Sequence, residues 1–408
     1  MEQSMVKWQR KIFFLCWAAY ASAYLCRTNL SIATPEIMST FSWNKTSVGL
    51  IGSSFFGAYA IGQLINGLIG DKLNSRYFIF TGLCVSSIVN FTMGFSSSLY
   101  LMIGLWAING FCLSMLWGPI VKTLSYWFSY EKRTKVAVWI STSMIGGYLL
   151  AWGVIGLVIA KATWRWAFWI PSGLVFMFAL IWVWKMRNHP AEVGIKPDFI
   201  EAKHDDINLN NSGISFLQMV YKHKLWLIAL ACIAQGVIKD GITLWAPTFL
   251  SETQNVGQEV LSFFSLTVPI MSLFGILCAG WLNNVFNQRQ NISIIVLLVC
   301  AGISCLGLYF FMNYNIFICT VLLGLASAFT YGANTLLLTL IPLKFIRYNR
   351  VSGVAGFLDF FSYVGAGLTG IVTGLVTDKF GWNGIILSWV TLALIGIVAV
   401  CFANKTEH

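Results

Sequence analysis

Long apolar runs separated by short polar loops dominate the hydropathy pattern of this chain of 408 residues. About 20 consecutive apolar residues form a helix long enough to cross a bilayer. The runs do not alternate apolar and polar residues as the strands of a membrane barrel do. The pattern therefore predicts an all-α integral membrane protein. Its twelve transmembrane helices are expected at residues 10–34, 46–70, 77–97, 99–127, 135–160, 165–186, 224–250, 257–283, 291–313, 315–342, 350–377 and 382–403.

The composition supports this class, because 57% of the residues are hydrophobic and 10% are charged. Soluble domains carry roughly 25% charged residues. The first apolar run follows the short segment Met1–Lys11 and continues into a full span. We therefore expect a retained first helix and not a cleaved signal peptide.

The net charge of +11 is mainly a signal of topology. Most of the 26 Lys and Arg residues fall in the termini and in the loops on one side of the predicted spans. The positive-inside rule then places both termini in the cytoplasm. We expect a multi-pass protein of the plasma (inner) membrane that contacts the lipid bilayer, and no nucleic-acid partner.

The longest polar stretch of the chain lies between the sixth and seventh predicted spans. It contains several charged and Asn residues and no apolar run. We interpret residues 187–223 as a cytoplasmic linker between two six-helix halves, residues 1–186 and residues 224–408.

Two features recur in the two halves at nearly the same offset. Arg27 and Lys239 each lie within an apolar run and each precede a proline by eight residues. The loops Gly67–Arg76 and Gly280–Arg289 share Gly, Asp or Asn, and Arg at identical spacing. Such internal repetition indicates duplication. A parallel repeat of six-span halves is a transporter architecture with its site near the bilayer midplane.

The two cations within spans predict a binding site for a small anion. A cation near mid-bilayer costs roughly 2.5–3.5 kcal/mol on insertion scales, so its presence points to a function. The guanidinium of Arg27 suits a carboxylate or phosphate bidentately, whereas Lys239 offers a compact point charge. The alternative is that Arg27 pairs internally with Asp359 or caps backbone carbonyl groups.

Asp240 and Asp359 are the acids that we place within spans. Asp240 is about 100° around the helix from Lys239, which suggests that the two side chains diverge. If Asp359 pairs with Lys239, the site favours a monoanion; if Asp359 is unpaired, it can carry a coupling proton. A structural ion pair is the alternative for both acids.

Polar and aromatic residues near the middle of the spans complete the predicted substrate site. Tyr and Trp can donate a hydrogen bond while they present an apolar wall. The alternative for each is packing between helices or contact with lipid. The candidates are Tyr24, Asn29, Gln63, Trp117, Ser143, Gln235, Trp245, Tyr331, Asn334 and Tyr363.

Asp71, Lys72 and Arg76 lie in the predicted cytoplasmic loop after the second span. Asp71 can pair with basic residues or with the end of a neighbouring helix, so we predict that these three residues act in gating. The alternative is a role in topology and turn formation. Lys122, near the cytoplasmic end of the fourth span, is interpreted as a snorkelling or gating residue.

The sequence gives no indication of an enzyme. It contains no G-x-x-x-x-G-K-[ST] phosphate loop. Three of its four His residues lie in the linker and the fourth is His408, so no pair can share a metal within the membrane. We therefore expect no catalytic residues, no cofactor and no metal site.

Over almost its whole length the chain resembles the major facilitator superfamily, whose loop motif is similar to Gly67…Asp71-Lys72…Arg76. A narrower resemblance is to the organophosphate:inorganic phosphate antiporter family. It rests on Tyr24-Leu-Cys-Arg27-Thr-Asn29, Trp117-Gly-Pro119…Lys122-Thr…Trp127-Phe with Glu131-Lys-Arg133, His189-Pro190-Ala-Glu-Val-Gly194-Ile-Lys-Pro197, and Lys239-Asp-Gly-Ile-Thr-Leu-Trp245-Ala-Pro247-Thr. The resemblance implies a monomeric transporter of organophosphates or sugar phosphates, with Arg27 and Lys239 as substrate-binding cations.

The sequence departs from this family at two positions. Its glycerol-phosphate members carry a Lys where we align Gln63 and a His where we align Ser143. Arg27-Thr-Asn29-Leu30-Ser31 also resembles a related branch of hexuronate and sugar-acid symporters. The resemblance therefore leaves open exchange for phosphate, symport of a carboxylate with a proton, and a non-transporting sugar-phosphate sensor.

Overall fold

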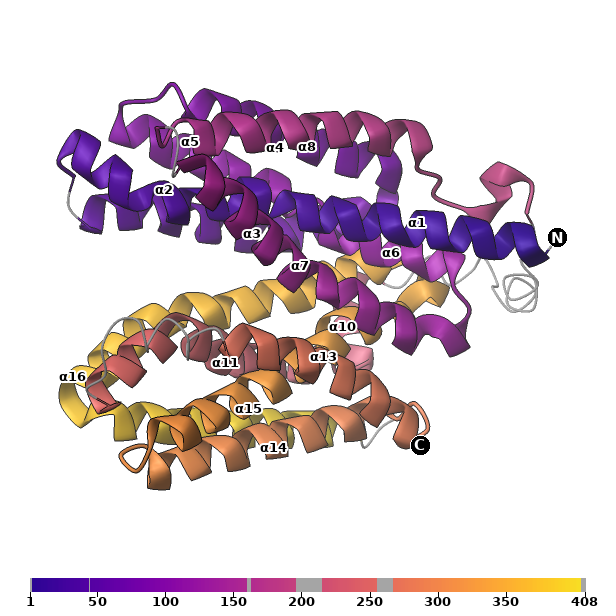
Figure 1. Cartoon of the computed structure of the whole chain (residues 1–408). Coiled ribbons are helices and arrows are strands. Elements are labelled where there is room, and N and C mark those ends of the chain that lie inside the picture. The colour runs from indigo at the N-terminus through magenta and orange to yellow at the C-terminus, as the bar shows by residue number, and fades with distance from the viewer. Residues whose placement is uncertain (1, 44, 160–162, 196–214, 255–266, 405–408) are drawn as a thin grey trace. The chain divides into compact units, whose positions relative to one another are not determined.

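The computed structural model describes residues 2–43, 45–159, 163–195, 215–254 and 267–404 (Figure 1). The linker residues 196–214 and the predicted start of the eighth span at residue 257 lie outside the described residues. By its internal contacts the chain divides into two compact units. The first comprises residues 1–136, 142–209 and 342–357, and the second comprises residues 137–141, 210–341 and 358–408.

The N-terminal part of the chain forms α-helices and two short 3₁₀ turns. The elements are α1 (Glu2–Ala23), α2 (Leu25–Phe41), α3 (Lys45–Lys72), α4 (Ser75–Met93), α5 (Leu99–Leu113), α6 (Trp117–Trp127), η1 (Tyr130–Lys132), α7 (Arg133–Ile159), α8 (Trp166–Lys185) and η2 (Pro190–Val193). Helix α4 packs against α5 and α8, and α3 packs against α5. The long helices of this unit run side by side (Figure 1).

The rest of the chain is also helical in its described residues. The elements are α10 (Phe216–Lys222), α11 (Leu225–Gln254), α13 (Thr267–Val285), α14 (Gln290–Phe311), α15 (Ile316–Thr335), η4 (Leu336–Leu340), η5 (Pro342–Tyr348) and α16 (Val351–Asn404). Helix α15 lies against α11, α13 and α14. The segment η4 is a π-helical turn and η5 is a 3₁₀ turn, so the hydrogen-bonding pattern changes where the chain passes from the second unit to the first.

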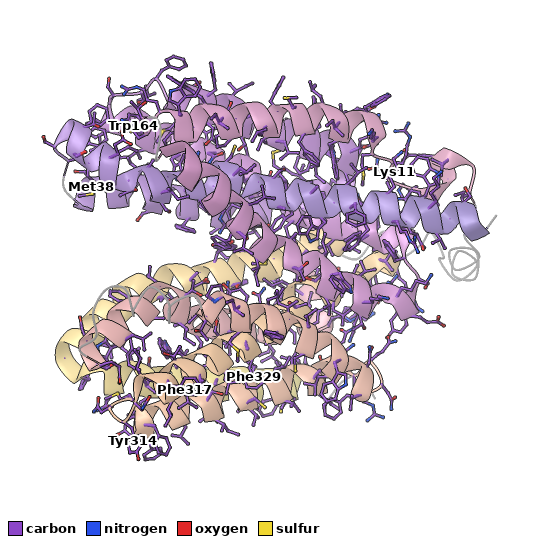
Figure 2. All side chains as sticks on the ribbon, in the orientation of Figure 1. Lys11, Met38, Trp164, Tyr314, Phe317 and Phe329 are labelled. Atoms are coloured by element: carbon purple, nitrogen blue, oxygen red, sulfur yellow. The ribbon has the colours of Figure 1, made fainter. Side chains whose placement is uncertain are left out.

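Nine helical segments among the described residues have the length and hydropathy of membrane spans. The other three predicted spans coincide with α1 and α2, with α4, and with α7. The predicted all-helical membrane fold is confirmed. Large apolar side chains such as Tyr100 (84% exposed) and Tyr314 (79% exposed) lie on the outside, as expected of surfaces that face lipid. Figure 2 shows the side chain of Tyr314 at the outer edge of the second unit.

The helices are interrupted at places that the hydropathy pattern does not mark. The first span breaks at Tyr24, between α1 and α2, and the fourth breaks between α5 and α6. The last two spans form one element, α16, with a non-helical residue at Gly381 (φ 63°, ψ −168°). A positive φ of this size is readily adopted by Gly, which has no Cβ.

Small residues allow the helices of each unit to approach closely. In the first unit a Cβ on Gly110 would collide with the carbonyl oxygen of Phe55. In the second unit a Cβ on Gly275 would collide with the carbonyl oxygen of Ala328. Such contacts are typical of helix packing in membranes, where small residues let the backbones meet.

Candidate functional site

In the first unit Arg27 lies among aromatic rings. It sits near the start of α2, is half-buried, and its guanidinium carbon lies 4.9 Å from the ring centroid of Tyr59 and 5.2 Å from that of Tyr24. The rings of Phe55 and Phe56 lie at 5.6 and 5.9 Å. A cation over an aromatic face gains about 0.5–2 kcal/mol without using its N–H donors. These four rings, here called the aromatic cage, orient the guanidinium. Its N–H groups can still donate hydrogen bonds to other partners.

A network of buried amides fixes the backbone around Arg27. Asn109 donates from Nδ2 to the carbonyl oxygen of Cys26 at 2.7 Å, and Asn90 donates to Asn109 Oδ1 at 3.1 Å. Asn29 donates to Asn90 Oδ1 at 2.8 Å and to the carbonyl oxygen of Ala167 at 3.1 Å. All three Asn side chains are fully buried. The network therefore ties the residues on both sides of Arg27 to α4, α5 and α8.

The other predicted residues of the first unit are buried at different places. The ring of Tyr24 packs against Tyr148 with a centroid distance of 4.7 Å. Trp117 is 3% exposed and Ser143 is fully buried on α7. Gln63 on α3 is also fully buried, and neither polar atom of its amide has a hydrogen-bond partner among the described residues.

In the second unit Lys239 is buried on α11 and forms an ion pair. Its Nζ lies 3.1 Å from Oδ1 of Asp240 and 5.3 Å from the ring centroid of Tyr331 on α15. The sequence suggested that the two charged side chains diverge, but the flexible side chain of Lys239 places its Nζ beside the carboxylate of Asp240. The pair carries no net charge, so an anion that binds Lys239 has to compete with Asp240.

One turn before Lys239, Gln235 donates from Nε2 to Oδ1 of Asn334 at 3.1 Å. Both side chains are buried. Trp245 is half-buried and lies edge-on to Trp382, with a centroid distance of 6.3 Å. The helices meet closely here, because a Cβ on Gly236 would collide with the carbonyl oxygen of Ser362.

Two further predicted residues of the second unit lie on α16. Asp359 is 5% exposed and Tyr363, one turn later, is half-buried. Both therefore sit on a helix that closely approaches α11, which carries Lys239.

Asp71 at the end of α3 binds the first turn of α16, and both belong to the first unit. Its carboxylate accepts hydrogen bonds from the backbone N–H groups of Ser352 at 2.8 Å and Gly353 at 2.9 Å. A carboxylate at a helix N-terminus satisfies free donors and complements the helix dipole. The predicted contact with a helix end is therefore present in this unit.

Lys122 on α6 caps the same C-terminal end of α3 that carries Asp71. Its Nζ donates to the carbonyl oxygens of Gly70 at 2.8 Å, Asp71 at 2.7 Å and Leu73 at 3.2 Å. A cation at a helix C-terminus is favourable. Lys122 is thus a buried cap of α3.

The other two predicted gating residues make different contacts. The backbone N–H of Arg76 donates to Oδ1 of Asn188 at 2.9 Å, and its carbonyl oxygen accepts from Nε1 of Trp182 at 2.9 Å. Arg76 therefore links the start of α4 to the end of α8. Lys72 is exposed.

His189 marks the start of the segment after α8. Its backbone N–H donates to Oε1 of Glu192 at 3.2 Å, and its ring lies on that of Tyr126 with a centroid distance of 4.0 Å. Part of the side chain remains exposed. Desolvation of the stacked ring lowers the pKa of His189, and the positive charge of Lys122 acts in the same direction, against the opposing effect of Glu192.

Several residues of the Arg27 region were not singled out from the sequence. They are Asn90, Asn109, Phe55 and Tyr59. A usable signal existed for the two Asn residues, because buried amides within apolar spans must find hydrogen-bond partners. The aromatic residues carried none, since 15% of the chain is aromatic.

Relatives of this chain include proteins named as phosphate-ester transporters and one named as a membrane sensor. A "Probable hexose phosphate transport protein" of Chlamydia pneumoniae is 26% identical over 97% of this chain and 92% of its own length. A "Glycerol-3-phosphate transporter" of Bacillus subtilis is 27% identical over 100% of this chain and 96% of its own. The "Membrane sensor protein UhpC" of Escherichia coli is 26% identical over 92% of this chain and 88% of its own.

Solved structures show the same fold. The crystal structure of a Major Facilitator Superfamily transporter, FucP, in the outward conformation superposes with a TM-score of 0.73. The sequence identity is 15%, and the match covers 97% of this chain and 99% of that one. The family model described as Major Facilitator Superfamily matches residues 16–358. The matching family, the relatives named as transporters and the FucP structure confirm the prediction that this protein is a transporter and not an enzyme. The chain belongs to the Major Facilitator Superfamily.

Proposed function

We propose that this protein is a secondary transporter that carries a small phosphorylated organic anion across the membrane by alternating access. The observation that carries the proposal is one cation near the middle of a span in each unit, Arg27 in its aromatic cage and Lys239 in its ion pair. The similarity to hexose phosphate and glycerol-3-phosphate transporters supports a phosphate ester as the substrate.

In this proposal Arg27 binds the anion bidentately and Lys239 supplies the second positive charge. Tyr24, Asn29 and Trp117 of the first unit contribute to binding or to the walls of the site. Ser143, Trp245 and Tyr363 are proposed for the same role, with Tyr331 and Asn334 near Lys239.

The proposed coupling is exchange for inorganic phosphate. In this scheme Asp240 neutralises Lys239 when no anion is bound, and it releases the ammonium when the anion arrives. Proton symport through Asp359 is the competing mechanism. Uptake measured with and without a transmembrane pH gradient distinguishes the two mechanisms, because only proton symport uses that gradient to accumulate the substrate.

Gating is proposed at the end of α3, where Asp71 holds the first turn of α16. Lys72 and Arg76 of the same loop are proposed to act with it. We further propose a monomer in the inner membrane with both termini in the cytoplasm and halves at residues 1–186 and 224–408. Protease cleavage of terminal tags in vesicles of known orientation tests the topology.

Uptake into proteoliposomes tests the transport proposal. Vesicles loaded with phosphate should take up labelled glucose 6-phosphate or glycerol 3-phosphate. The change Arg27→Gln should raise KM about 10- to 100-fold, because hydrogen bonds to a charged group contribute about 1.5–3 kcal/mol. The control Lys379→Gln removes an exposed lysine and should leave KM unchanged. Normal transport by Arg27→Gln would refute the proposed role.

Lys239 needs a paired design, because its loss leaves Asp240 without its ion-pair partner. The double change Lys239→Gln with Asp240→Asn removes both charges. It should lose phosphate-ester uptake while it still reaches the membrane. Uptake equal to that of the unaltered protein would show that Lys239 does not bind the anion.

A sensor is the second candidate function, favoured by the similarity to UhpC. A sensor binds the phosphate ester without net flux. Ligand-dependent thermal stabilisation together with no counterflow would therefore favour the sensor over the transporter.

A further inference from the structure

The buried side-chain amide of Gln63 makes no hydrogen bond to the described residues. Its side chain is 0% exposed, and neither Oε1 nor Nε2 has a hydrogen-bond partner among the described residues. Buried polar groups in folded proteins are nearly always hydrogen-bonded, and exceptions are frequent at functional positions. The amide of Gln63 thus offers one acceptor and two donor hydrogens.

Gln63 lies beside the residues that hold Arg27. Tyr59, whose ring centroid is 4.9 Å from the guanidinium carbon, precedes Gln63 by one helical turn on α3. Side chains four residues apart on a helix are neighbours on one face, roughly 5–6 Å apart at Cβ. The unpaired amide therefore shares a face of α3 with the ring that contacts the guanidinium of Arg27.

The second unit repeats this arrangement around Lys239. Gln235 precedes Lys239 by one turn on α11, and Asn334 follows Tyr331 by one turn on α15. Gln235 is 0% exposed and donates to Asn334, while its Oε1 has no hydrogen-bond partner in the described residues. Turning the amide over would exchange the two atoms and still leave one of them unpaired.

Buried amides near these positions but off the site are paired by the protein itself. Asn66, one turn after Gln63 on α3, donates to the carbonyl oxygen of Phe111 at 3.1 Å and to Oγ of Ser114 at 2.8 Å. Asn90 and Asn109 are paired in the same way. Burial of an amide in this fold is therefore compatible with pairing of its polar atoms by the protein, whereas Gln63 has neither atom paired; Oδ1 of Asn29 and Oε1 of Gln290, like Oε1 of Gln235, also have no partner among the described residues.

The chemistry of the unpaired atoms narrows the class of ligand. An ionised phosphate oxygen has no hydrogen to donate, and a phosphate monoester near neutral pH keeps at most one P–OH hydrogen, so the phosphate group cannot satisfy the amide oxygens of both Gln63 and Gln235. A hydroxyl group donates and accepts, and it can pair with either atom of an amide in either orientation. Cations next to neutral amides thus suit an anion that also carries hydroxyl groups.

We propose that Gln63 and Gln235 bind hydroxyl groups of the substrate, so that the protein selects polyhydroxylated anions over anions of the same charge without hydroxyls. The proposal rests on the proposed transport function and adds the source of its specificity. In this proposal Arg27 and Lys239 bind the charged group of the substrate, and the two amides bind the hydroxyl groups on its carbon skeleton.

The test compares two phosphate esters with the same three-carbon skeleton. Proteoliposomes loaded with phosphate take up labelled inorganic phosphate, and glycerol 3-phosphate and n-propyl phosphate compete for uptake. We expect the unaltered protein to favour glycerol 3-phosphate by about tenfold or more in inhibition constant. Glucuronate is a third competitor, and strong inhibition by it would identify a sugar acid as the natural polyhydroxylated anion.

The changes Gln63→Met and Gln235→Met keep the side-chain length and remove the hydrogen bonds. Each should reduce the preference for glycerol 3-phosphate about 5- to 10-fold, a larger change than in the KM for inorganic phosphate. The matched control is Gln290→Met, because Gln290 is a buried glutamine at the first residue of α14 whose Oε1 also has no partner in the described residues. It should keep the full preference.

Three outcomes would contradict the proposed roles of the two glutamines or the proposed transport scheme. An unchanged preference in both variants with normal phosphate exchange would overturn the proposal and indicate buried water as the partner of the amides. A parallel loss for both esters would overturn it as well, because the glutamines would then act on the phosphate. If Gln63→Met does not fold, Gln63→Leu and Gln235→Met give the same measurement. Absence of phosphate exchange in the unaltered protein would instead refute the proposed coupling to phosphate, and the same competition would then be measured on uptake of labelled glycerol 3-phosphate.

Discussion

Replacement of Asp71 by Asn tests the contact between the end of α3 and the first turn of α16. The carboxylate of Asp71 is 4% exposed and accepts two backbone hydrogen bonds, from Ser352 at 2.8 Å and Gly353 at 2.9 Å. Asparagine has nearly the same shape but one acceptor oxygen. Its NH₂ group would face one of the two N–H donors, which would then be buried without a partner.

The expected loss follows from these two bonds. A hydrogen bond to a charged group contributes about 1.5–3 kcal/mol, and the neutral version is roughly half as strong. Losing one bond and weakening the other therefore costs about 2–4 kcal/mol. The lost charge at the N-terminus of α16 acts in the same direction.

Hydrogen exchange of the amides in residues 350–357 measures this contact directly, because the N–H groups of Ser352 and Gly353 are the donors. A loss of about 2–4 kcal/mol predicts a 30- to 1000-fold larger opening constant for this turn. The control Lys132→Gln removes a charge at an exposed position outside this contact and should leave exchange unchanged. If Asp71→Asn exchanges within twofold of the unaltered protein, the reasoning is refuted.

Three further predictions concern packing, the amide network and pH. Gly275→Ala should lower the free energy of unfolding by about 3 kcal/mol, because the new Cβ would collide with the backbone of Ala328. Gly104→Ala has open space at its Cβ and should be neutral or stabilising. Thermal unfolding of the two variants measures the difference. Asn109→Leu should cost about 2–3 kcal/mol, because it leaves buried partners unpaired, and an unchanged melting temperature would contradict the network. The lowered pKa of His189 means that the folded state binds fewer protons than the unfolded one, so the turn at Glu192 should weaken as pH falls below 6.5. Hydrogen exchange at pH 7.5 and 5.5 measures this, and His189→Asn should abolish the difference.

The helical membrane fold was predictable because hydrophobic length alone determines where a helix can span a bilayer. The breaks at Tyr24 and between α5 and α6 were not, since a single turn without regular hydrogen bonds leaves the hydropathy unchanged. The change from α-helix to π-helix at Leu336–Leu340 has the same cause, because an apolar run has no signature of its hydrogen-bond register.

Of the candidate site, the two cations and the neighbouring Tyr24 and Tyr331 could be singled out from the sequence, whereas the α3 partners of Arg27 and the ion pair of Lys239 could not. Arg27 and Lys239 stand out, because a cation within an apolar run is costly. The aromatic partners of Arg27 depend on which face of α3 meets α2, and one sequence does not determine that rotation. The ion pair of Lys239 depends on the bend of a flexible side chain, which helix periodicity does not describe.

The π-helical turn Leu336–Leu340 fixes which way the side chains at the end of α15 point within the second unit. A wide turn of this kind accommodates an additional residue within an otherwise regular helix. Removing one residue from it would restore ordinary α-helical winding and rotate the residues that follow by about 100°. The hydroxyl of Thr339, which lies 3.4 Å from that of Ser141, would then turn away from this partner although neither residue had been altered. A single residue in excess of regular winding thus determines which side chains of this segment can meet α7.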